Sequence, residues 1–250
     1  MASTRVLAAG GTGGTGRLAV RRLSQLGIPT RILTGDRRRA TGAGLVDVVQ
    51  GDALVEEDCQ RAVDGCDSVI CAVGVHNTRW KGPCVDGDGI INLARAAEQA
   101  GVHRFVLVSS LGVGDSMEWM PFPVKAVFQP FNMIPLLREK ARSEEYVRSS
   151  ALAWTILRPG LLHGGRMRSD PVLTATGRVP GLSGRQAVAD VAVRCLRSDH
   201  ARGRVLAVAD GWVRRWLQGE PFQLDASVSA GTGYRAAQIE GRRYLARVNA

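Results

Sequence analysis

The stretch Gly10–Gly16 near the start of the chain contains five glycines, three of them spaced as GxxGxxG. It follows the apolar run 5–9 and precedes a segment, 17–26, whose apolar residues recur with helical spacing. Glycine at these points permits a tight turn, close approach of the backbone to a ligand, and close packing of helix against strand. The free N–H groups and the dipole at the start of a helix attract phosphate. The stretch therefore predicts a loop that holds the pyrophosphate of a dinucleotide, formed by Gly10, Thr12, Gly13, Gly14, Thr15 and Gly16.

Three consecutive arginines, residues 37–39, follow the next apolar run, 30–34. In a dinucleotide-binding unit, an acidic residue at this place accepts a hydrogen bond from the ribose 2′-hydroxyl, whereas arginine accommodates a 2′-phosphate. Arg37 and Arg38 therefore favour NADP(H) over NAD(H) as the cofactor. Asp36 keeps NAD(H) open, and arginines that simply face solvent are the other alternative.

The ends of later apolar runs carry small or acidic residues that suit the remainder of such a cofactor. The carboxylate after the run 46–50 could accept a hydrogen bond from the adenine amino group, although an aspartate that only forms a turn is the alternative. Small residues after the run 68–73 would let the cofactor lie close to the backbone. The predicted cofactor contacts in these places are Asp52, Ala53, Ala72, Val73, Gly74 and Pro159.

Ser109, Ser110 and Lys140 are the candidate catalytic residues. The serines end the apolar run 104–109, and ligands of parallel sheets bind beyond the carboxyl ends of the strands. A serine hydroxyl there could orient a substrate oxygen, and the Lys140 ammonium could bind the nicotinamide ribose or stabilise a developing oxyanion. Serines that only cap the strand and a lysine in solvent are the alternatives.

Strand patterns alternate with helical patterns of about ten residues along the chain. This alternation predicts an α/β fold with a doubly wound parallel sheet of Rossmann type. The segment 112–135, rich in Met, Pro, Phe and Trp, is expected to be a long irregular loop. Strands are expected at 5–9, 30–34, 46–50, 68–73, 104–109, 154–157 and 205–208, and helices at 17–26, 56–63, 88–100, 136–149 and 185–198.

Composition argues against several classes of protein. The net charge is +10, but the arginines are scattered and aromatic residues make up only 5%, so no nucleic-acid platform is expected. No apolar run reaches the ~18–20 residues of a membrane helix, and the first residues lack a signal-peptide pattern, so we expect a cytoplasmic protein without membrane contact. The five cysteines show no CxxC spacing and are expected to be buried apolar residues; no metal site is predicted.

The chain resembles the atypical short-chain dehydrogenase/reductases of the NAD(P)H-binding, NmrA-like kind. The resemblance implies a Rossmann-type core with a small C-terminal substrate-covering region and NAD(P)H-dependent oxidoreductase activity. Many short-chain reductases use a YxxxK pair; Lys140 matches the lysine, but Leu136 stands at the tyrosine position. A tyrosine-dependent reduction is therefore not supported. The stretches that carry the resemblance are 6–16, 51–52, 88–101, 102–112, 140–160 and 190–192.

A conjugated acceptor suits a site without a tyrosine, because its product anion is delocalised and needs little proton donation. The leading hypothesis is reduction of a quinone or similar aromatic carbonyl compound. A non-catalytic NADP-binding redox sensor or scaffold and an epimerase or isomerase that retains NAD are the alternatives. Side chains that could wall a flat ligand are Trp80, Met117, Trp119, Met120, Phe122, Phe128 and Phe131.

The chain shows no internal repeat and no domain linker. We expect one domain over residues 1–226, with substrate-covering parts at about 112–135 and 160–185. Residues 227–250 are expected to be a loosely attached extension. The sequence gives no indication of the oligomeric state.

Overall fold

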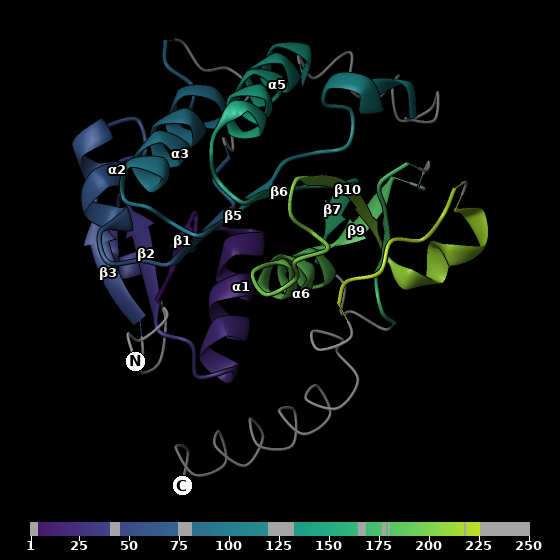
Figure 1. Cartoon of the computed structure of the whole chain (residues 1–250), viewed down its shortest axis with the longest axis horizontal. Helices are drawn as coiled ribbons and strands as arrows, with labels where there is room; N and C mark the ends of the chain where they lie inside the picture. Colours follow the sequence, from purple (N-terminus) through teal and green to yellow (C-terminus); the bar gives the residue numbers. More distant parts are fainter. Residues whose placement is uncertain are drawn as a thin grey trace, which may run out of the picture.

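The computed structural model describes residues 5–40, 46–74, 82–119, 133–164, 169–176, 179, 181–217 and 219–225. A large sheet has the strand order β3-β2-β1-β4-β5-β6-β10-β8, and β7 and β9 form a small parallel sheet (Figure 1). All neighbours in the large sheet are parallel except β8, which pairs antiparallel with β10. The strands are β1 (Val6–Ala9), β2 (Thr30–Thr34), β3 (Val46–Gln50), β4 (Ser68–Cys71), β5 (Arg104–Val108), β6 (Trp154–Pro159), β7 (Leu161–His163), β8 (Val172–Thr174), β9 (Leu182–Gly184) and β10 (Arg204–Ala209).

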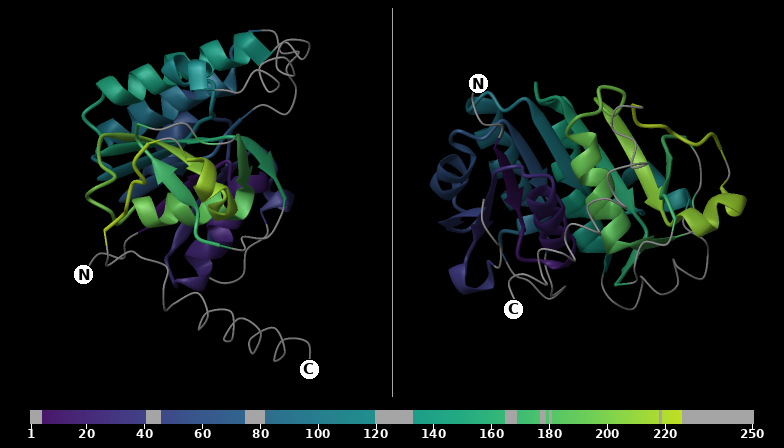
Figure 2. Two further views of the ribbon diagram at one scale, coloured as in Figure 1. Left: turned by 90° about the vertical axis from the view of Figure 1, so that its right-hand side faces the viewer. Right: turned by 90° about the horizontal axis from the view of Figure 1, so that it is seen from below.

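The helices form two layers, with α1 and α6 on one face of the sheet and α2, α3 and α5 on the other (Figures 1 and 2). None of the helices in the described ranges is long and apolar enough to cross a membrane. The α-helices are α1 (Gly14–Gln25), α2 (Glu56–Val63), α3 (Ile90–Gln99), α5 (Met133–Ser149) and α6 (Arg185–Cys195). The short helices are η1 (Arg37–Arg39), the π-helix η2 (Val85–Gly89), η3 (Gly114–Trp119) and η4 (Gly211–Trp216).

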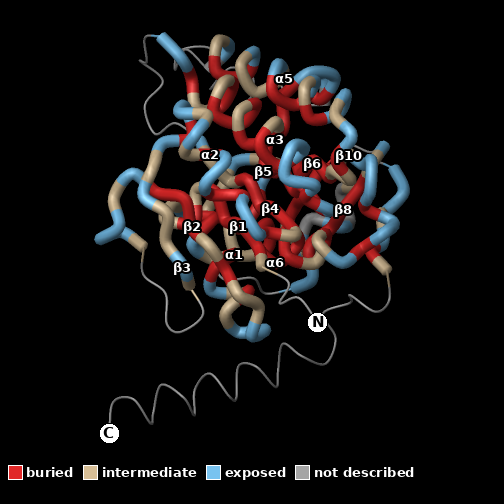
Figure 3. Tube along the Cα trace, turned by 60° about the vertical axis from the view of Figure 1, so that its left-hand side comes forward, coloured by how far each residue is buried: buried red, intermediate tan, exposed pale blue. Residues whose placement is uncertain are grey.

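The sheet is buried on both faces, as a parallel sheet between two helical layers must be. All four residues of β1 are at most 1% exposed, and the buried stretches in Figure 3 follow the central strands. One core lies between the sheet and α2, α3 and α5, with Phe105 at its centre; the other packs α1 and α6 against the opposite face. These two cores hold the carboxyl ends of the strands in register.

The strand order reverses between β1 and β4. The chain runs outward from β1 through β2 to β3 and then returns to add β4 on the other side of β1. Crossover connections leave this point in opposite directions, so a crevice opens there at the carboxyl ends of the strands. The fold therefore predicts the position of a ligand before any side chain is considered.

The expected α/β class and the doubly wound parallel sheet are confirmed, and every expected strand and helix forms with ends shifted by a few residues. The sequence prediction missed β7, β8 and β9, which are only three residues long and arise from tertiary pairing. It also missed η2, which precedes α3. The expected loop at 112–135 contains η3 and the start of α5; residues 120–132 and the extension 227–250 lie outside the described residues. The single-domain boundary at 226 stays a prediction.

Buried charges attach α5 to the sheet. Arg158, near the end of β6, binds Glu144 of α5 at 2.6 Å between Nη2 and Oε2, and both side chains are 3% exposed. Its Nη1 binds Asp115 Oδ1 of η3 at 2.6 Å. A guanidinium removed from water needs such partners, so the position of α5 depends on this network.

We predict that Glu144→Gln lowers the free energy of unfolding by about 3 kcal/mol, because the buried Arg158 guanidinium loses a carboxylate partner. Urea denaturation monitored by circular dichroism measures the change. The matched control is Glu139→Gln on the same helix, where the ion pair with Arg142 has side chains 30% and 47% exposed. The control should change stability by less than about 1 kcal/mol; equal losses in the two variants would contradict the prediction.

Candidate functional site

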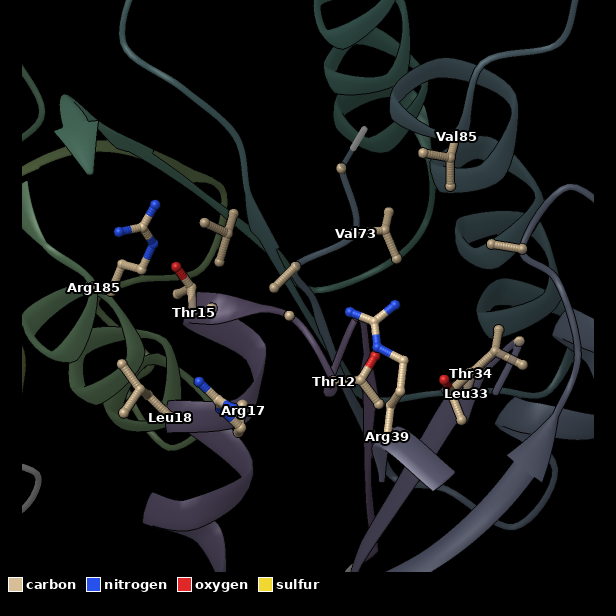
Figure 4. A pocket seen from close by; sticks show the side chains of 18 of the residues that line it. Thr12, Thr15, Arg17, Leu18, Leu33, Thr34, Arg39, Val73, Val85 and Arg185 are labelled. Atoms are coloured by element: carbon tan, nitrogen blue, oxygen red, sulfur yellow. The ribbon is translucent and has the colours of Figure 1, made fainter. Parts of the chain in front are cut away.

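A cleft of about 970 Å³ lies where the strand order reverses (Figure 4). Its walls come from the glycine loop, the segments after β2, β3 and β4, the end of β5, helix α5 and the start of α6. The predicted residues that line it are Gly10, Thr12, Gly13, Gly14, Thr15, Asp52, Ala53, Ala72, Val73, Gly74, Ser109 and Lys140. The predicted residues outside the lining are Gly16, Arg37, Arg38, Ser110 and Pro159.

The glycine loop brings three stretches of backbone into contact. Gly10 has a φ of +77°, and a Cβ there would lie 2.8 Å from the Val73 nitrogen and collide with the Ala72 carbonyl group. A Cβ at Gly16 would collide with the Gly10 carbonyl group, 2.7 Å from its carbon. Gly16 therefore supports the loop from behind instead of lining the cleft.

Helix α1 begins at this loop without neutralising its own dipole. Gly13 is the N-cap residue, no side chain caps the helix, and its first turn contains no acidic residue. The first amides of a helix have no partner within the helix, so the start of α1 presents donors and partial positive charge to the cleft. This is an arrangement that binds a phosphate group.

Arg39 is the arginine after β2 that lines the cleft, instead of the predicted Arg37 and Arg38. Asp36 caps η1 by accepting from the Arg38 N–H (3.0 Å), and both carboxylate oxygens also accept from the Arg38 guanidinium (3.0 and 3.1 Å). The hydrogen bond from the Arg38 side chain is the main cause of a lowered Asp36 pKa. Arg38 thus engages the acidic residue, and Arg39 faces the cleft.

Asp52 and Ala53 lie on the cleft wall after β3. The Asp52 carboxylate accepts from the Leu54 N–H (3.0 Å), so this aspartate also forms the turn that was its alternative role. The Asn92 side chain of α3 donates to the Ala53 carbonyl (3.2 Å) and fixes the segment against the helix. The cofactor contact of these two residues stays a prediction.

Lys140 lies on the cleft wall as one half of a buried ion pair. Its Nζ is 2.5 Å from Asp86 Oδ1, and the two side chains are 13% and 1% exposed. Asp86 belongs to the π-helix η2, a rare local structure that often occurs at functional sites. A Cβ at Gly74 would lie 3.4 Å from the same carboxylate oxygen, so the end of β4 also contacts the pair. Lys140 is therefore not the solvated lysine that was its alternative.

The two predicted serines differ in their surroundings. Ser109 lines the cleft, is 7% exposed, and its Oγ has no hydrogen-bond partner among the described residues. The Ser110 hydroxyl donates to the Leu111 carbonyl (3.0 Å) at the end of the strand. An unsatisfied buried hydroxyl calls for a ligand or water, so Ser109 is the better candidate for contact with a ligand.

No tyrosine of the described part of the chain lines the cleft. Leu136, at the position of the tyrosine in YxxxK, is a buried core residue. Tyr146 packs against the core on the α3 side, with Arg95 5.9 Å from its ring centre.

The sequence prediction missed four charged residues of the cleft region: Arg17, Arg39, Asp86 and Arg185. Asp86 is 54 residues from Lys140, a distance at which no local pattern reports contact. Arg185 offered a signal, because it is a basic residue at the start of a helix, where acidic residues are usual. Such a placement opposes the helix dipole and therefore marks a site.

Two further residues do not line the cleft. His163 lies outside the lining, although its neighbours Leu162 and Gly164 belong to it; its Nε2 is 2.6 Å from Asp210 Oδ2. Met117 is half-buried in η3 and also does not line the cleft. The other proposed wall residues lie outside the described residues or, for Trp119, have no described side chain: Trp80, Met120, Phe122, Phe128 and Phe131.

All five cysteines are buried free thiols, as expected. Burial raises the pKa of Cys59, Cys71 and Cys195 to about 12. A thiol with such a pKa carries almost no thiolate at neutral pH, so these residues are inert packing groups.

The sequence matches the NAD(P)H-binding family over residues 10–199, and the chain belongs to this family. It is 31% identical over 217 residues to an uncharacterized chloroplastic protein of Arabidopsis thaliana, covering 82% of this chain and 76% of that protein. It is 30% identical over 213 residues to the (4-alkanoyl-5-oxo-2,5-dihydrofuran-3-yl)methyl phosphate reductase of Streptomyces griseus, covering 82% and 67%. The anaerobillin reductase ChuY of Escherichia coli O157:H7 has the same fold, with a TM-score of 0.71 at 24% identity, covering 83% of this chain and 98% of that one.

The family confirms the resemblance found in the sequence and the binding of NAD(P)H. The cleft fits such a cofactor on its own geometry, since the glycine positions have no room for a Cβ and the start of α1 is uncapped. The Ser109 hydroxyl, which has no hydrogen-bond partner among the described residues, adds a donor on the wall of the same cleft. The roles of individual residues stay predictions, which the following experiments test.

We predict that Gly16→Ala weakens NADPH binding by at least about tenfold, because the new Cβ would push the Gly10 carbonyl and distort the loop. Fluorescence titration of the purified protein measures the dissociation constant, and thermal melting checks the fold. Gly181→Ala is the matched control, since a Cβ there meets only Leu111 Cδ2 at 4.0 Å and the residue lies outside the cleft lining. Unchanged NADPH affinity in folded Gly16→Ala would show that the loop does not hold the pyrophosphate.

Proposed function

We propose that the protein is an NADPH-dependent reductase of quinones or other conjugated aromatic carbonyl compounds. The observation that carries the proposal is the buried Lys140–Asp86 ion pair on the wall of a cofactor cleft that lacks a tyrosine among the described residues. The family supplies the general NAD(P)H-dependent redox role. The acceptor class follows from what the remaining side chains can do.

The ion pair favours an acceptor whose reduced form is a stabilised anion. Lys140 presents its Nζ on the cleft wall, and Asp86 Oδ1 lies 2.5 Å away as its ion-pair partner. Such a lysine stabilises negative charge on a nearby oxygen better than it releases a proton. A delocalised quinol anion needs only this stabilisation and can take its proton from water, whereas a simple alkoxide needs a proton donor in the transition state.

Three side chains divide the remaining tasks. When bound, the reduced nicotinamide supplies the hydride, which adds to the conjugated acceptor and moves an electron pair onto its oxygen. The Ser109 hydroxyl donates a hydrogen bond to that oxygen, and Lys140 stabilises the developing negative charge. Asp86 does not meet the substrate in this scheme; as the ion-pair partner of Lys140 it orients the ammonium.

The Streptomyces relative supports a reductase, because its name gives that activity. It is 30% identical to this chain over an aligned region that covers 82% of this chain. The substrate does not follow from that similarity. The cytoplasmic location expected from the sequence also stays a prediction, since the Arabidopsis relative is described as chloroplastic.

NADPH is the proposed form of the cofactor on the strength of Arg39. This arginine lines the cleft beyond β2 and forms no ion pair within the described ranges, while Asp36 is engaged by Arg38. A guanidinium at this place suits a 2′-phosphate, and a carboxylate already bound by arginine is a poorer acceptor for a ribose hydroxyl.

We predict that Arg39→Gln weakens NADPH binding about tenfold and leaves NADH binding unchanged, because only NADPH carries the phosphate. Titration with both cofactors measures the two dissociation constants. Arg37→Gln is the matched control on the same short helix, outside the cleft lining, and should change neither. An equal loss for both cofactors in Arg39→Gln would contradict the assignment.

We predict that the purified protein oxidises NADPH in the presence of model quinones and that Lys140→Met lowers kcat about 100-fold, since it removes the charge that stabilises the oxyanion. The assay follows NADPH absorbance across a panel of quinones, aromatic ketones and aliphatic ketones. Arg138→Met, an exposed position on the same helix, should retain full activity. Tight NADPH binding without turnover on any acceptor would instead favour a non-catalytic sensor or scaffold.

A further inference from the structure

Arg185 extends toward the glycine loop from the start of α6, the helix that packs beside α1. It is the first residue of α6 and lines the cleft. A Cβ built on Gly14 would lie 2.9 Å from both Cδ and Nε of Arg185, so this side chain lies directly against the start of α1. Arg185 and Arg39 lie on opposite sides of the pocket in Figure 4, so the two cations address different parts of a ligand.

Two helices begin at the place where Arg185 lies. Arg185 and Gly14 meet at the starts of α6 and α1, and Arg22 meets Asp190 further along the same two helices. The helices therefore run side by side in the same direction, and Figure 1 shows α1 and α6 as neighbours. Neither helix has a side-chain cap or an acidic residue in its first turn. The partial positive charges of both helix starts therefore add to the guanidinium charge.

The position of Arg185 is fixed by its surroundings. Arg22 Nε binds Asp190 Oδ1 at 3.2 Å, with side chains 13% and 4% exposed, and an apolar core packs α6 on α1. The Gly184 N–H, at the N-cap of α6, donates to Asp210 Oδ1 at 2.7 Å. A side chain carried on such a rigid helix start is preorganised for its ligand.

The charge of Arg185 has no counterion among the described residues. Arg185 forms no ion pair there, whereas Lys140 on the cleft wall is matched by Asp86. A guanidinium beside two helix starts lies in a region of positive potential. The arrangement therefore favours a negatively charged ligand.

We propose that Arg185 binds the pyrophosphate of the cofactor from the α6 side, opposite the amides of α1. Its planar guanidinium would donate two parallel hydrogen bonds to phosphate oxygens, which fits its place beside Gly14. The inference rests on the proposed cofactor site and adds a contact that NADPH and NADH share. The contact would also link the cofactor to the expected substrate-covering segment 160–185, because β9 in that segment leads directly into Arg185.

The test is the affinity of the full chain for three ligands, measured by calorimetry: NADPH, NADH and adenosine 2′-monophosphate, which lacks the pyrophosphate. Arg185→Gln should weaken both NADPH and NADH by about tenfold or more and leave adenosine 2′-monophosphate unchanged. Arg185→Lys should fall between, because a lysine keeps the charge but loses the paired hydrogen bonds. Arg197→Gln, an exposed arginine just beyond α6, is the control for loss of net charge and should change nothing.

Two results would overturn the inference. One is unchanged affinity for NADPH and NADH in folded Arg185→Gln. A raised KM for a sulfonated quinone in the same variant would then place the anion on the substrate. The other is an equal loss of affinity in Arg197→Gln, which would reduce the effect to net charge. Neither measurement of affinity depends on turnover, so absence of reductase activity would defeat the proposed function and leave this inference standing.

Discussion

The site depends on the contact of three backbone segments at Gly10, Gly16 and Ala72. Gly10 adopts a positive φ beneath the Ala72 carbonyl, and Gly16 packs on the Gly10 carbonyl. These contacts seat the start of α1 directly on the ends of β1 and β4, so its free amides face the point where the strand order reverses. A side chain at either glycine would lift the helix away, and α6, which packs along α1, would move with it.

The opposite wall of the cleft is held by charge instead of close backbone packing. Helix α5 carries both Glu144, which binds the buried Arg158, and Lys140, which binds the buried Asp86. Lys140 and Glu144 lie one helical turn apart on α5. The Glu144–Arg158 ion pair that fixes the helix to the sheet therefore also fixes the position of Lys140 along the cleft wall. Breaking either pair would leave a charge in a poorly hydrated place, which restricts α5 to one arrangement.

The sequence was sufficient for the sheet and the glycine loop because both depend on local signals. Apolar runs gave β1, β2 and β4 their places, and GxxGxxG located the start of α1. The strands β7 and β9 were missed because segments of three residues carry too little periodicity to be recognised in a sequence. Asp86 was missed because its place at the site comes from its ion pair with Lys140, which is distant in the sequence. Arg39 was missed because the turn of η1, and not the residue type, decides which of the three arginines faces the cleft.

The distribution of charge along the cleft connects the cofactor site with the acceptor proposed for it. Arg39 and Arg185 both line the cleft, come from different elements and form no ion pairs within the described ranges. Lys140, on α5, is already balanced by Asp86. The ends of the cleft thus attract anions, whereas its catalytic wall is neutral as a whole and gains nothing from a charged substrate. A neutral, conjugated acceptor becomes negative only as it is reduced. Such a wall therefore binds the transition state of this acceptor more tightly than its ground state.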